Sequence, residues 1–400
     1  MGALCCSGEK GTETEPSAGR AEGLKHYDHQ VLAAESSYLT YFGGLRTTGP
    51  LPAGVSGLAN LGNTCFINSA LQCLAAVPSL TDYFLSGSYK RDLTNRRSGI
   101  LASLFAALLL QRCKEGVRLS HPTDLVTHVW RYSHFSPRSQ NDSQEFLAYF
   151  LDQLHEDLNK SSGKSAVSSR QEVAGDEETM ADLAWQSHLL SNRSIIVEKF
   201  QGVLKSSLSC MKCKHTSVTF EPFMFLSVPI SSGRSDTLKE CLGEFTKSER
   251  LGGSEKWTCP KCAVPVEALK KLDLWRIPPV LIIHLKRFYC QYESMGKLTK
   301  AISYPISNLS LDQFIGRQSR LPSYNLIAKI NHMGSIASGH YTAHILVNGI
   351  WLECDDDRCS IVPSSALQSS DTYVLMYAAS KDHDLRTSDT SVSSATTLPD

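Results

Sequence analysis

One cysteine in this sequence stands where a thiol would be reactive. Residues 57–66 read GLANLGNTCF, so glycines and asparagines form a turn and Cys65 opens an apolar helix. A thiol at a helix N-terminus feels the positive end of the helix dipole and unpaired backbone N–H groups, which favour the thiolate. The same N–H groups, with the Asn60 amide, are suited to stabilising an oxyanion. Cys65 is therefore a candidate nucleophile, and the alternative is a buried cysteine at the end of a turn.

A histidine far along the chain is the candidate base. Residues 339–347 read GHYTAHILV, and Asn-Gly separates them from IWLECDDD at 350–357. Asn-Gly between two apolar runs predicts a β-hairpin with a primed turn. Counting outward from this turn puts His340 opposite Asp357, with Asp355 as its diagonal neighbour and Asp356 on the other face. A carboxylate at Asp355 would orient the imidazole.

Alternatives remain open for this hairpin. His340 is also consistent with an ordinary polar residue at a strand start, and His344 shares its face under strict alternation. A bulge near the aspartates would break the parity on which the Asp355 assignment depends. Gly339 permits a close approach of the backbone, which suits a narrow cleft.

Four further cysteines have the spacing of metal ligands. Cys210 and Cys213 form one C-x-x-C pair, and Cys259 and Cys262 form another. Two such pairs complete a tetrahedral zinc site, and four thiolates leave no open coordination position. We therefore predict a structural zinc ion at the end of a β-ribbon. A redox role would require a βαβ setting, which the pattern lacks.

Apolar periodicity predicts the elements that position these residues. Helical spacing covers 65–77, 99–113 and a segment from 141 or 142 to about 158, which Asn141 or Asp142 would cap. The second half is rich in Val, Ile, Tyr and Phe, which is typical of strands. The predicted strands are 217–229, 280–288, 324–331, 340–347, 350–354 and 372–378. Helices followed by strands indicate an α+β fold.

Composition narrows the function classes. The 400 residues are 42% hydrophobic, and 40 Lys and Arg balance 40 Asp and Glu, so no positive field indicates a nucleic-acid partner. The number of cysteines, 13, is odd, so they cannot all form disulfide pairs, and no secretory signal precedes them. We therefore expect reduced thiols and a cytoplasmic location. The richest apolar run, 100–110, is too short for a bilayer, which takes about 20 residues.

Three segments lack apolar periodicity. We interpret 1–53 as a flexible leader, 160–182 as a surface insertion and 381–400 as a disordered tail. The leader begins MGALCCS, which suggests acylation of Gly2, Cys5 and Cys6 and hence peripheral membrane association. The myristoylation pattern has Ser or Thr where Cys6 stands, so a leader without lipid is the alternative.

Five motifs in order resemble the ubiquitin-specific proteases, a family of papain-like cysteine deubiquitinases. They are the Cys65 segment, QNDSQEF at 140–146, the two C-x-x-C pairs, LKRF at 285–288 and GHY at 339–341. The similarity runs over roughly 55–380. It implies a catalytic domain at 54–380 with a papain-like fold. That fold has a helical thumb, a β-sheet palm and zinc-ribbon fingers, the last at about 200–290.

The resemblance also implies an activity and its residues. The chain would hydrolyse the isopeptide bond between the ubiquitin C-terminal glycine and a lysine, and its partners would be ubiquitin and ubiquitinated proteins. The implied catalytic residues are Cys65, His340, Asp355 and Asn60, and the implied substrate-binding residues are Asp142, Gln144 and Tyr341. Asp142 would pair with the arginine of the Leu-Arg-Gly-Gly tail, or would serve only as a helix cap.

Two departures from the family pattern leave the predicted machinery intact. Cys354 stands where the family usually has an aromatic residue, and the QNDSQ run differs from the commoner QQDAQ. A non-catalytic ubiquitin-binding scaffold, a zinc-ribbon interaction module and a protease for a ubiquitin-like modifier are the competing hypotheses. The presence of Cys65, His340 and Asp355 together argues against the scaffold.

Overall fold

The structure is a computed structural model that describes most of the chain from residue 52 to residue 380. The described ranges are 52, 54–93, 99–114, 116–136, 139–161, 176–230, 237–291, 294–317, 321–336 and 338–380. The candidate acylation sites Gly2, Cys5 and Cys6 lie outside these ranges, as do the tail and residues 162–175 of the predicted insertion. The end of that predicted insertion, from Glu177 onward, is helical.

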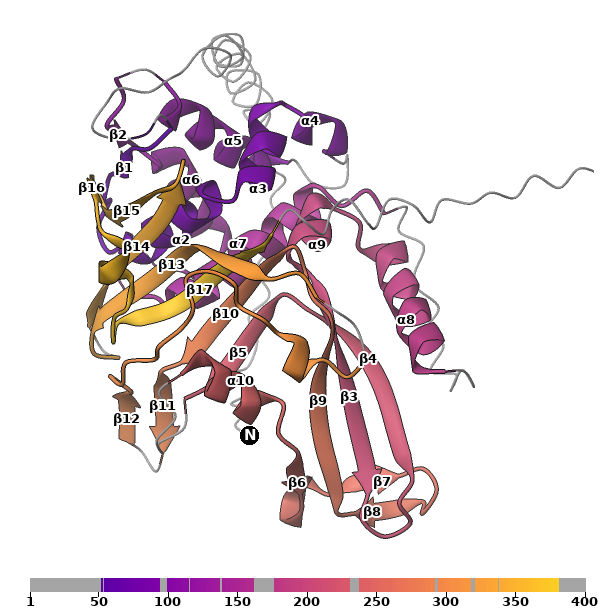
Figure 1. Cartoon of the computed structure of the whole chain (residues 1–400). Coiled ribbons are helices and arrows are strands. Elements are labelled where there is room, and N and C mark those ends of the chain that lie inside the picture. The colour runs from indigo at the N-terminus through magenta and orange to yellow at the C-terminus, as the bar shows by residue number, and fades with distance from the viewer. Residues whose placement is uncertain are drawn as a thin grey trace, which may run out of the picture.

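A seven-stranded sheet lies at the centre of the fold. Its strand order is β16-β15-β14-β13-β17-β10-β5, and every neighbouring pair is antiparallel except β10 and β5 (Figure 1). The strands are β5 (Phe225–Pro229), β10 (Val280–Lys286), β13 (Tyr324–Gly334), β14 (Gly339–Val347), β15 (Ile350–Asp355), β16 (Arg358–Ile361) and β17 (Thr372–Ala379). The predicted histidine hairpin is therefore β14–β15, near one edge of the sheet.

Both faces of this sheet are buried. Strand β10 reads VLIIHLK, an almost continuous apolar run of the kind found where helices or loops cover both sides. Val280 and Ile282 pack into the core beneath the helices, whereas Leu281, Ile283 and Leu285 pack into a second core on the opposite face. The sheet is thus a rigid support for residues at its strand ends.

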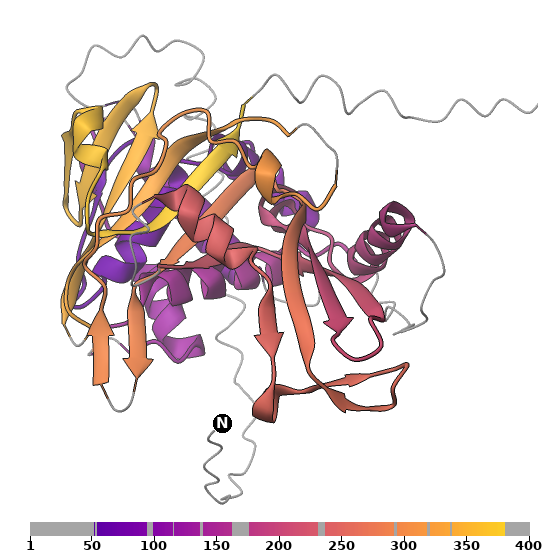
Figure 2. The same ribbon diagram turned by 60° about the horizontal axis from the view of Figure 1, so that its bottom comes forward.

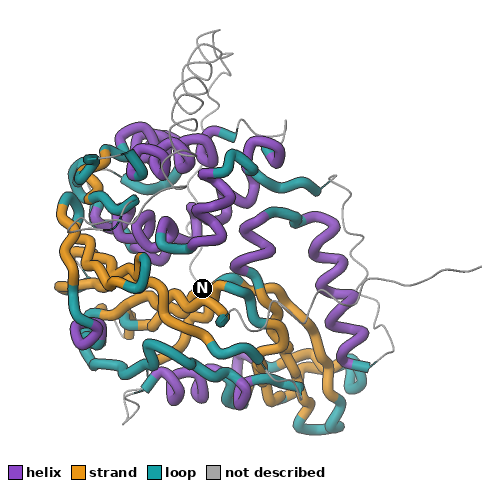
Figure 3. The backbone as a smooth tube through the Cα atoms, turned by 45° about the horizontal axis from the view of Figure 1, so that its top comes forward, coloured by secondary structure: helices purple, strands orange, loops and turns teal. Residues whose placement is uncertain are grey.

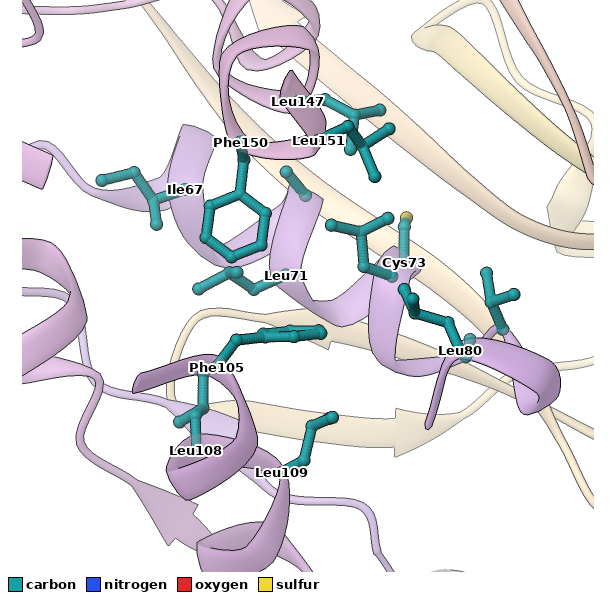
Figure 4. Close-up of a cluster of buried hydrophobic side chains, with 14 of the residues drawn as sticks. Ile67, Leu71, Cys73, Leu80, Phe105, Leu108, Leu109, Leu147, Phe150 and Leu151 are labelled. Carbon is teal, nitrogen blue, oxygen red and sulfur yellow. The ribbon is translucent and has the colours of Figure 1, made fainter. Parts of the chain in front are cut away.

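Helices cover one side of the sheet, as Figure 3 shows. They are α2 (Cys65–Ala75), α3 (Pro78–Leu85), α4 (Tyr89–Asp92), α5 (Ile100–Arg112), α6 (Thr123–Tyr132), α7 (Ser143–Asp157) and α9 (Ile195–Phe200), with α8 (Glu177–Ser191) further out (Figure 1). Helix α2 is buried along almost its whole length, between α7 on one side and β14 on the other. Figure 4 shows the side chains of Ile67 and Leu71 of α2 in one buried cluster with Phe105 of α5 and Phe150 of α7.

A second sheet projects away from the helices as a long ribbon (Figures 1 and 2). Its strand order is β4-β3-β9-β6, and a small hairpin of β7 and β8 lies at its tip. The strands are β3 (Gly202–Cys210), β4 (Thr216–Phe223), β6 (Glu249–Leu251), β7 (Trp257–Cys259), β8 (Val264–Val266) and β9 (Ala268–Arg276). Helix α10 (Leu238–Phe245) packs against β5 at the base of the ribbon.

Two predicted strands are each divided in the structure. The segment 217–229 breaks at Met224, so that β4 belongs to the ribbon and β5 to the central sheet. The segment 280–288 breaks at Arg287, after which β11 (Phe288–Gln291) pairs with β12 (Ser294–Lys297). Strand β10 therefore belongs to the central sheet, and the ribbon ends at Arg276 rather than near 290.

The ends of the helices follow local chemistry. Asp142, rather than Asn141, caps α7, because its Oδ1 accepts hydrogen bonds from the backbone N–H groups of Gln144 and Glu145. Helix α2 ends at Ala75, two residues before the predicted end, and Pro78 then begins α3 at a position where its missing N–H has no effect. Of the helices in the described ranges, none has the length and apolar character needed to cross a bilayer.

Candidate active site

Cys65 is the first residue of α2, as the sequence predicted. The preceding turn is held by Thr64, whose Oγ1 accepts from the Leu61 N–H at 2.9 Å and donates to Asn60 Oδ1 at 3.1 Å. Gly62, with φ of 110°, adopts a backbone conformation that only glycine takes readily. The turn therefore delivers the thiol to the head of a helix that is fixed by core packing.

The environment of Cys65 differs from the sequence expectation in one respect. Burial raises the pKa of the thiol, and the negative charge of Asp356 raises it further. The backbone N–H of Tyr341 and those of the first turn of α2 oppose this by favouring the thiolate, but burial is the larger effect. The helix N-terminus does favour the thiolate, as expected, but burial of a residue that is only 3% exposed outweighs it.

The hydrogen bond from Tyr341 also places the hairpin beside the thiol. Tyr341 follows His340 in β14, and α2 packs against this strand. The structure thus brings the candidate nucleophile and the candidate base to the same end of α2, although they are far apart in the sequence.

His340 and Asp355 form a short contact on the hairpin. The distance from His340 Nε2 to Asp355 Oδ1 is 2.6 Å, and both side chains are partly exposed. Val347 pairs with Ile350, and Asn348 and Gly349 both have positive φ, which is the primed turn that Asn-Gly predicted. This register makes Asp355 the diagonal neighbour of His340, as counting from the turn predicted.

The parity prediction for Asp356 was wrong. The chain does not continue as a strand to Asp357 but turns at Asp356, whose φ is 46°, so that Asp355 pairs with Arg358 in a second hairpin. The Asp356 carboxylate therefore lies close to His340 and Asp355 instead of on the opposite face. The sequence did not predict this turn, because an Asp-Asp pair favours a hairpin turn less strongly than Asn-Gly does.

Asp356 connects the hairpin to the nucleophile loop. Its Oδ2 accepts from Asn60 Nδ2 at 2.7 Å and its Oδ1 from Asn68 Nδ2 at 2.8 Å. Its backbone carbonyl accepts from the Leu58 N–H at 2.7 Å. Sequence reasoning missed Asn68, which lies in the first turn of α2 and gives no signal apart from being a polar residue on a buried helix.

The Asn60 side chain is held at both ends. Thr64 donates to its carbonyl oxygen, and Asp356 accepts one of its two amide hydrogens. The amide can therefore not rotate freely, and its second N–H remains for another acceptor. This arrangement is suited to a donor that must be oriented before negative charge develops.

A groove of about 270 Å³ runs beside the hairpin. Its lining comes from the start of α7, from β13 and β14 and from β11. The lining residues are Gln140, Asn141, Asp142, Phe288, His332, Ser335, Ile336, Gly339 and Tyr341. A β-carbon on Gly339 would lie 2.0 Å from His332 Nε2, so this strand and the His332 ring approach too closely for any other residue.

The three predicted substrate-binding residues are placed differently from one another. Asp142 and Tyr341 line the groove, whereas Gln144 lies in the first turn of α7 and is not among the lining residues. Asp142 also accepts from the Tyr373 hydroxyl at 2.5 Å, in addition to capping α7. Asp142 therefore caps α7 and also lines the groove.

Two other histidines near the hairpin, His344 and His332, have different surroundings. His344 faces Glu353 on the neighbouring strand, with 3.3 Å between Nε2 and Oε1. Burial lowers the pKa of His332 to about 4, so its ring is neutral and packs against Phe288 and Tyr341.

The four predicted metal ligands meet at the tip of the ribbon. The sulfur atoms of Cys213 and Cys259 are 3.6 Å apart, and those of Cys210 and Cys262 are 3.9 Å apart. A tetrahedral Zn–S₄ centre with bonds of about 2.3 Å requires sulfur separations of about 3.8 Å. The Cys213 N–H donates to Cys210 Sγ and lowers the pKa of Cys210 to about 6. The cluster therefore has the size and the ligand set of a zinc site.

Comparison with known proteins agrees with this geometry. Residues 56–377 match the family model described as ubiquitin carboxyl-terminal hydrolase. The chain is 38% identical over 339 residues to ubiquitin carboxyl-terminal hydrolase 2 of Bos taurus, an alignment that covers 81% of this chain and 55% of the relative. It is 33% identical over 355 residues to ubiquitin carboxyl-terminal hydrolase 21 of Mus musculus, covering 82% and 62%. The chain thus spans little more than half the length of these curated relatives.

Solved structures show the same fold. The Ubp8 SAGA DUB module bound to ubiquitin aldehyde is similar with a TM-score of 0.68 at 24% identity, over 85% of this chain and 72% of that chain. The module bound to monoubiquitin gives a TM-score of 0.66 at 25% identity, over 86% and 74%. These similarities confirm the predicted α+β, papain-like fold. Because the family model covers most of the chain, the protein belongs to the ubiquitin carboxyl-terminal hydrolase family, the ubiquitin-specific proteases.

Proposed function

We propose that this chain is a thiol-dependent deubiquitinase that hydrolyses the bond between the C-terminal glycine of ubiquitin and a lysine amine. The observation that carries the proposal is the pair of His340 and Asp355, 2.6 Å apart, on the strand whose Tyr341 N–H reaches the Cys65 thiol. Membership of the ubiquitin carboxyl-terminal hydrolase family supports the choice of ubiquitin as substrate.

The nucleophile must be activated during the reaction. Because burial raises the pKa of Cys65, the thiol holds its proton at neutral pH and requires a base. Asp355 engages His340 Nε2, which leaves Nδ1 to accept the thiol proton. The thiolate then attacks the carbonyl carbon of the terminal glycine, and Asp355 stabilises the imidazolium that forms.

The developing oxyanion meets donors that are already in place. The N–H groups at the start of α2 face the thiol, and the Asn60 amide is oriented by Thr64 and Asp356. Donors fixed in advance do not have to reorganise as the charge develops, so their stabilisation acts on the transition state.

The remaining steps use the same histidine. His340 returns its proton to the departing lysine amine, and the C–N bond breaks to leave a thioester on Cys65. Water then attacks the thioester with His340 as base, which releases the ubiquitin carboxylate and restores the thiol. Each proton taken from sulfur or water is therefore returned to the amine or to sulfur.

The groove beside the hairpin is the proposed path of the ubiquitin tail. Asp142 and Tyr341 line it, and the close approach of Gly339 to His332 makes it narrow, which suits a Gly-Gly end without side chains. A carboxylate has more acceptor sites than the cap and the Tyr373 contact use, so Asp142 can also accept from an arginine of the tail.

We further propose that the cysteine cluster holds a structural zinc ion. Cys210, Cys213, Cys259 and Cys262 would ligate it, and four thiolates leave no position for catalysis. The ion would join the β3–β4 turn to the β7–β8 hairpin and so stiffen the ribbon tip.

The decisive experiment uses ubiquitin that carries a thiol-reactive group at its C-terminus. We expect a covalent adduct with the wild type and none with Cys65→Ala. The matched control is Cys73→Ala, a buried cysteine in the same helix that lies away from the groove and should still be labelled. The His340→Ala variant should be labelled far more slowly than the wild type.

Two other outcomes would point elsewhere. A wild-type protein that binds ubiquitin and is correctly folded by circular dichroism, yet is not labelled, would identify a non-catalytic scaffold. Labelling by a ubiquitin-like modifier with the same reactive group, but not by ubiquitin, would identify a different substrate and retain the chemistry.

A further inference from the structure

Two cysteines outside the proposed active site face each other across the second hairpin. Cys354 of β15 and Cys359 of β16 are direct cross-strand partners, and their sulfur atoms are 3.1 Å apart. A disulfide bond is about 2.05 Å long and joins β-carbons about 3.8 Å apart, a separation close to that of residues directly opposite in a β-pair. The two sulfurs need to approach by only about 1 Å to bond.

A buried cation lies beside this pair. Arg112 of α5 is 3% exposed, and its Nη2 donates to Gln72 Oε1 at 2.7 Å. Its Nε and Nη1 are buried without a hydrogen-bond partner, and the ionisable groups that act on it within the described residues are Cys354, Cys359 and Cys113. A buried guanidinium is stabilised by a neighbouring anion, and these cysteine sulfurs are the groups beside it that can become one.

The two thiols differ in the way that disulfide formation requires. Cys359 is partly exposed, and both its contact with Cys354 and the charge of Arg112 lower its pKa. Cys354 is buried, and the same contact together with burial raises its pKa well above the usual range. The pair thus sets a partly exposed sulfur, the more readily ionised of the two, against a buried one.

We propose that Cys354 and Cys359 form a redox-modification site, at which a peroxide converts the two thiols into a disulfide across the β15–β16 hairpin. The Cys359 thiolate attacks one peroxide oxygen, the O–O bond breaks, and a sulfenic acid forms with release of water or alcohol. Cys354 sulfur then attacks the sulfenic sulfur, and water leaves with the Cys354 proton. Two thiols are oxidised by two electrons, and one peroxide is reduced.

The site lies at the base of the turn that carries the proposed catalytic carboxylates. Cys354 precedes Asp355, and the turn between the two cysteines contains Asp356. Drawing the strands together at this point shifts Asp355 relative to His340 and Asp356 relative to Asn60. Because a misplacement of about 1 Å can lower a rate by roughly a hundredfold, we expect a fraction of that shift to lower kcat/KM roughly tenfold.

Peptide mapping tests the modification without any activity measurement. The full-length Cys65→Ala protein, with its metal retained, is treated with hydrogen peroxide, alkylated and digested with trypsin. Trypsin cleaves after Arg358, between the two cysteines, so the reduced chain gives two separate peptides. The oxidised chain should give the same peptides joined by a disulfide that dithiothreitol separates.

Two variants make this result specific. Cys359→Ser should yield no linked peptide, and Arg112→Met should form the disulfide several-fold more slowly, because the thiolate loses its counter-ion. Circular dichroism confirms that each variant is folded. Absence of the linked peptide in folded protein, or linkage of Cys354 to Cys73 or Cys113 instead, would overturn the proposal.

The effect on turnover is a separate measurement that rests on the proposed function. Wild-type enzyme and Cys359→Ser are exposed to peroxide with the active-site thiol protected by a reversible ubiquitin thioester mimic, and are then assayed after its removal. The wild type should lose about tenfold more kcat/KM than the variant, and dithiothreitol should restore it. Equal losses would overturn the link to Asp355, while the peptide map would still decide whether the disulfide forms.

Discussion

The substitution Asp356→Asn tests how the hairpin turn supports the nucleophile loop. Asp356 has φ of 46°, a conformation that asparagine tolerates, so the change removes the charge without straining the turn. The carboxylate accepts from Asn60 and Asn68 through separate oxygens, whereas an amide has only one acceptor oxygen. One hydrogen bond is lost and the other loses its charge.

The magnitude follows from these contacts. A hydrogen bond to a charged group contributes about 1.5–3 kcal/mol, and the partial exposure of Asp356 favours the lower half of this range. A loss of about 2 kcal/mol in the positioning of Asn60 corresponds to a fall of roughly thirtyfold in kcat. The fall should not exceed that of Asn60→Ala, for which loss of an oxyanion donor predicts about 10²–10³.

The assay is hydrolysis of ubiquitin with a fluorogenic amide at its C-terminus, with kcat and KM determined separately. We expect KM to change little, because Asp356 is not among the residues that line the groove. Removing the negative charge should also lower the pKa of Cys65, and so move the acid limb of the labelling rate to lower pH. The control Asp357→Asn alters the exposed neighbour on the same turn and should leave kcat within about twofold.

A double-mutant cycle decides whether Asp356 acts through Asn60. In an Asn60→Ala background, Asp356→Asn should have little further effect on kcat, because the group that it positions is absent. If the two losses instead multiply in the double variant, or if the pH profile does not move, the proposed support of the amide by the turn is refuted.

Three further results are expected. Cys213→Ser, or removal of zinc by a chelator, should weaken ubiquitin binding and so raise KM. The value of kcat should stay nearly unchanged, because the ribbon tip lies far from α2 (Figure 1). A parallel fall in kcat would contradict this prediction. Arg287→Met should lower the free energy of unfolding in urea by roughly 3 kcal/mol, because Arg287 donates to the carbonyl oxygens of Thr372, Leu298 and Lys300; a loss below about 1 kcal/mol would count against its structural role. Burial lowers the pKa of His284 and His332 to about 4. Both rings are neutral in the fold and charge in the unfolded chain, so stability should be full above about pH 6.5 and fall from there toward pH 4; an unfolding free energy that is flat over this range would exclude the effect.

The sequence predicted local chemistry well where a short signal determines it. Asn348-Gly349 gave the turn and the register of β14–β15, and from that register the neighbour relation of His340 and Asp355 followed. The spacing of the four cysteines likewise gave their meeting point at the ribbon tip. These predictions succeeded because a two-residue turn or a C-x-x-C knuckle has few alternative geometries.

Predictions failed where tertiary packing outweighs local pattern. The helix N-terminus favours a thiolate at Cys65, but burial, which the local sequence does not reveal, raises the pKa of the thiol. The segment 280–288 looked like one strand, yet Arg287 directs its guanidinium into the core and ends β10. Strand β3 was missed because both of its faces are only partly buried, so its serines do not alternate cleanly with apolar residues.

The contact between Asp356 and the Asn60 loop has a consequence for biosynthesis. The nucleophile helix leaves the ribosome early, whereas the hairpin that supplies its base and its supporting carboxylate is made almost three hundred residues later. Because synthesis proceeds from the N-terminal end, the Cys65 thiol lacks its proposed base until the hairpin has been made. On the proposed function, catalysis therefore becomes possible only after β14 and β15 have joined the sheet, and a chain that stops before them lacks the base.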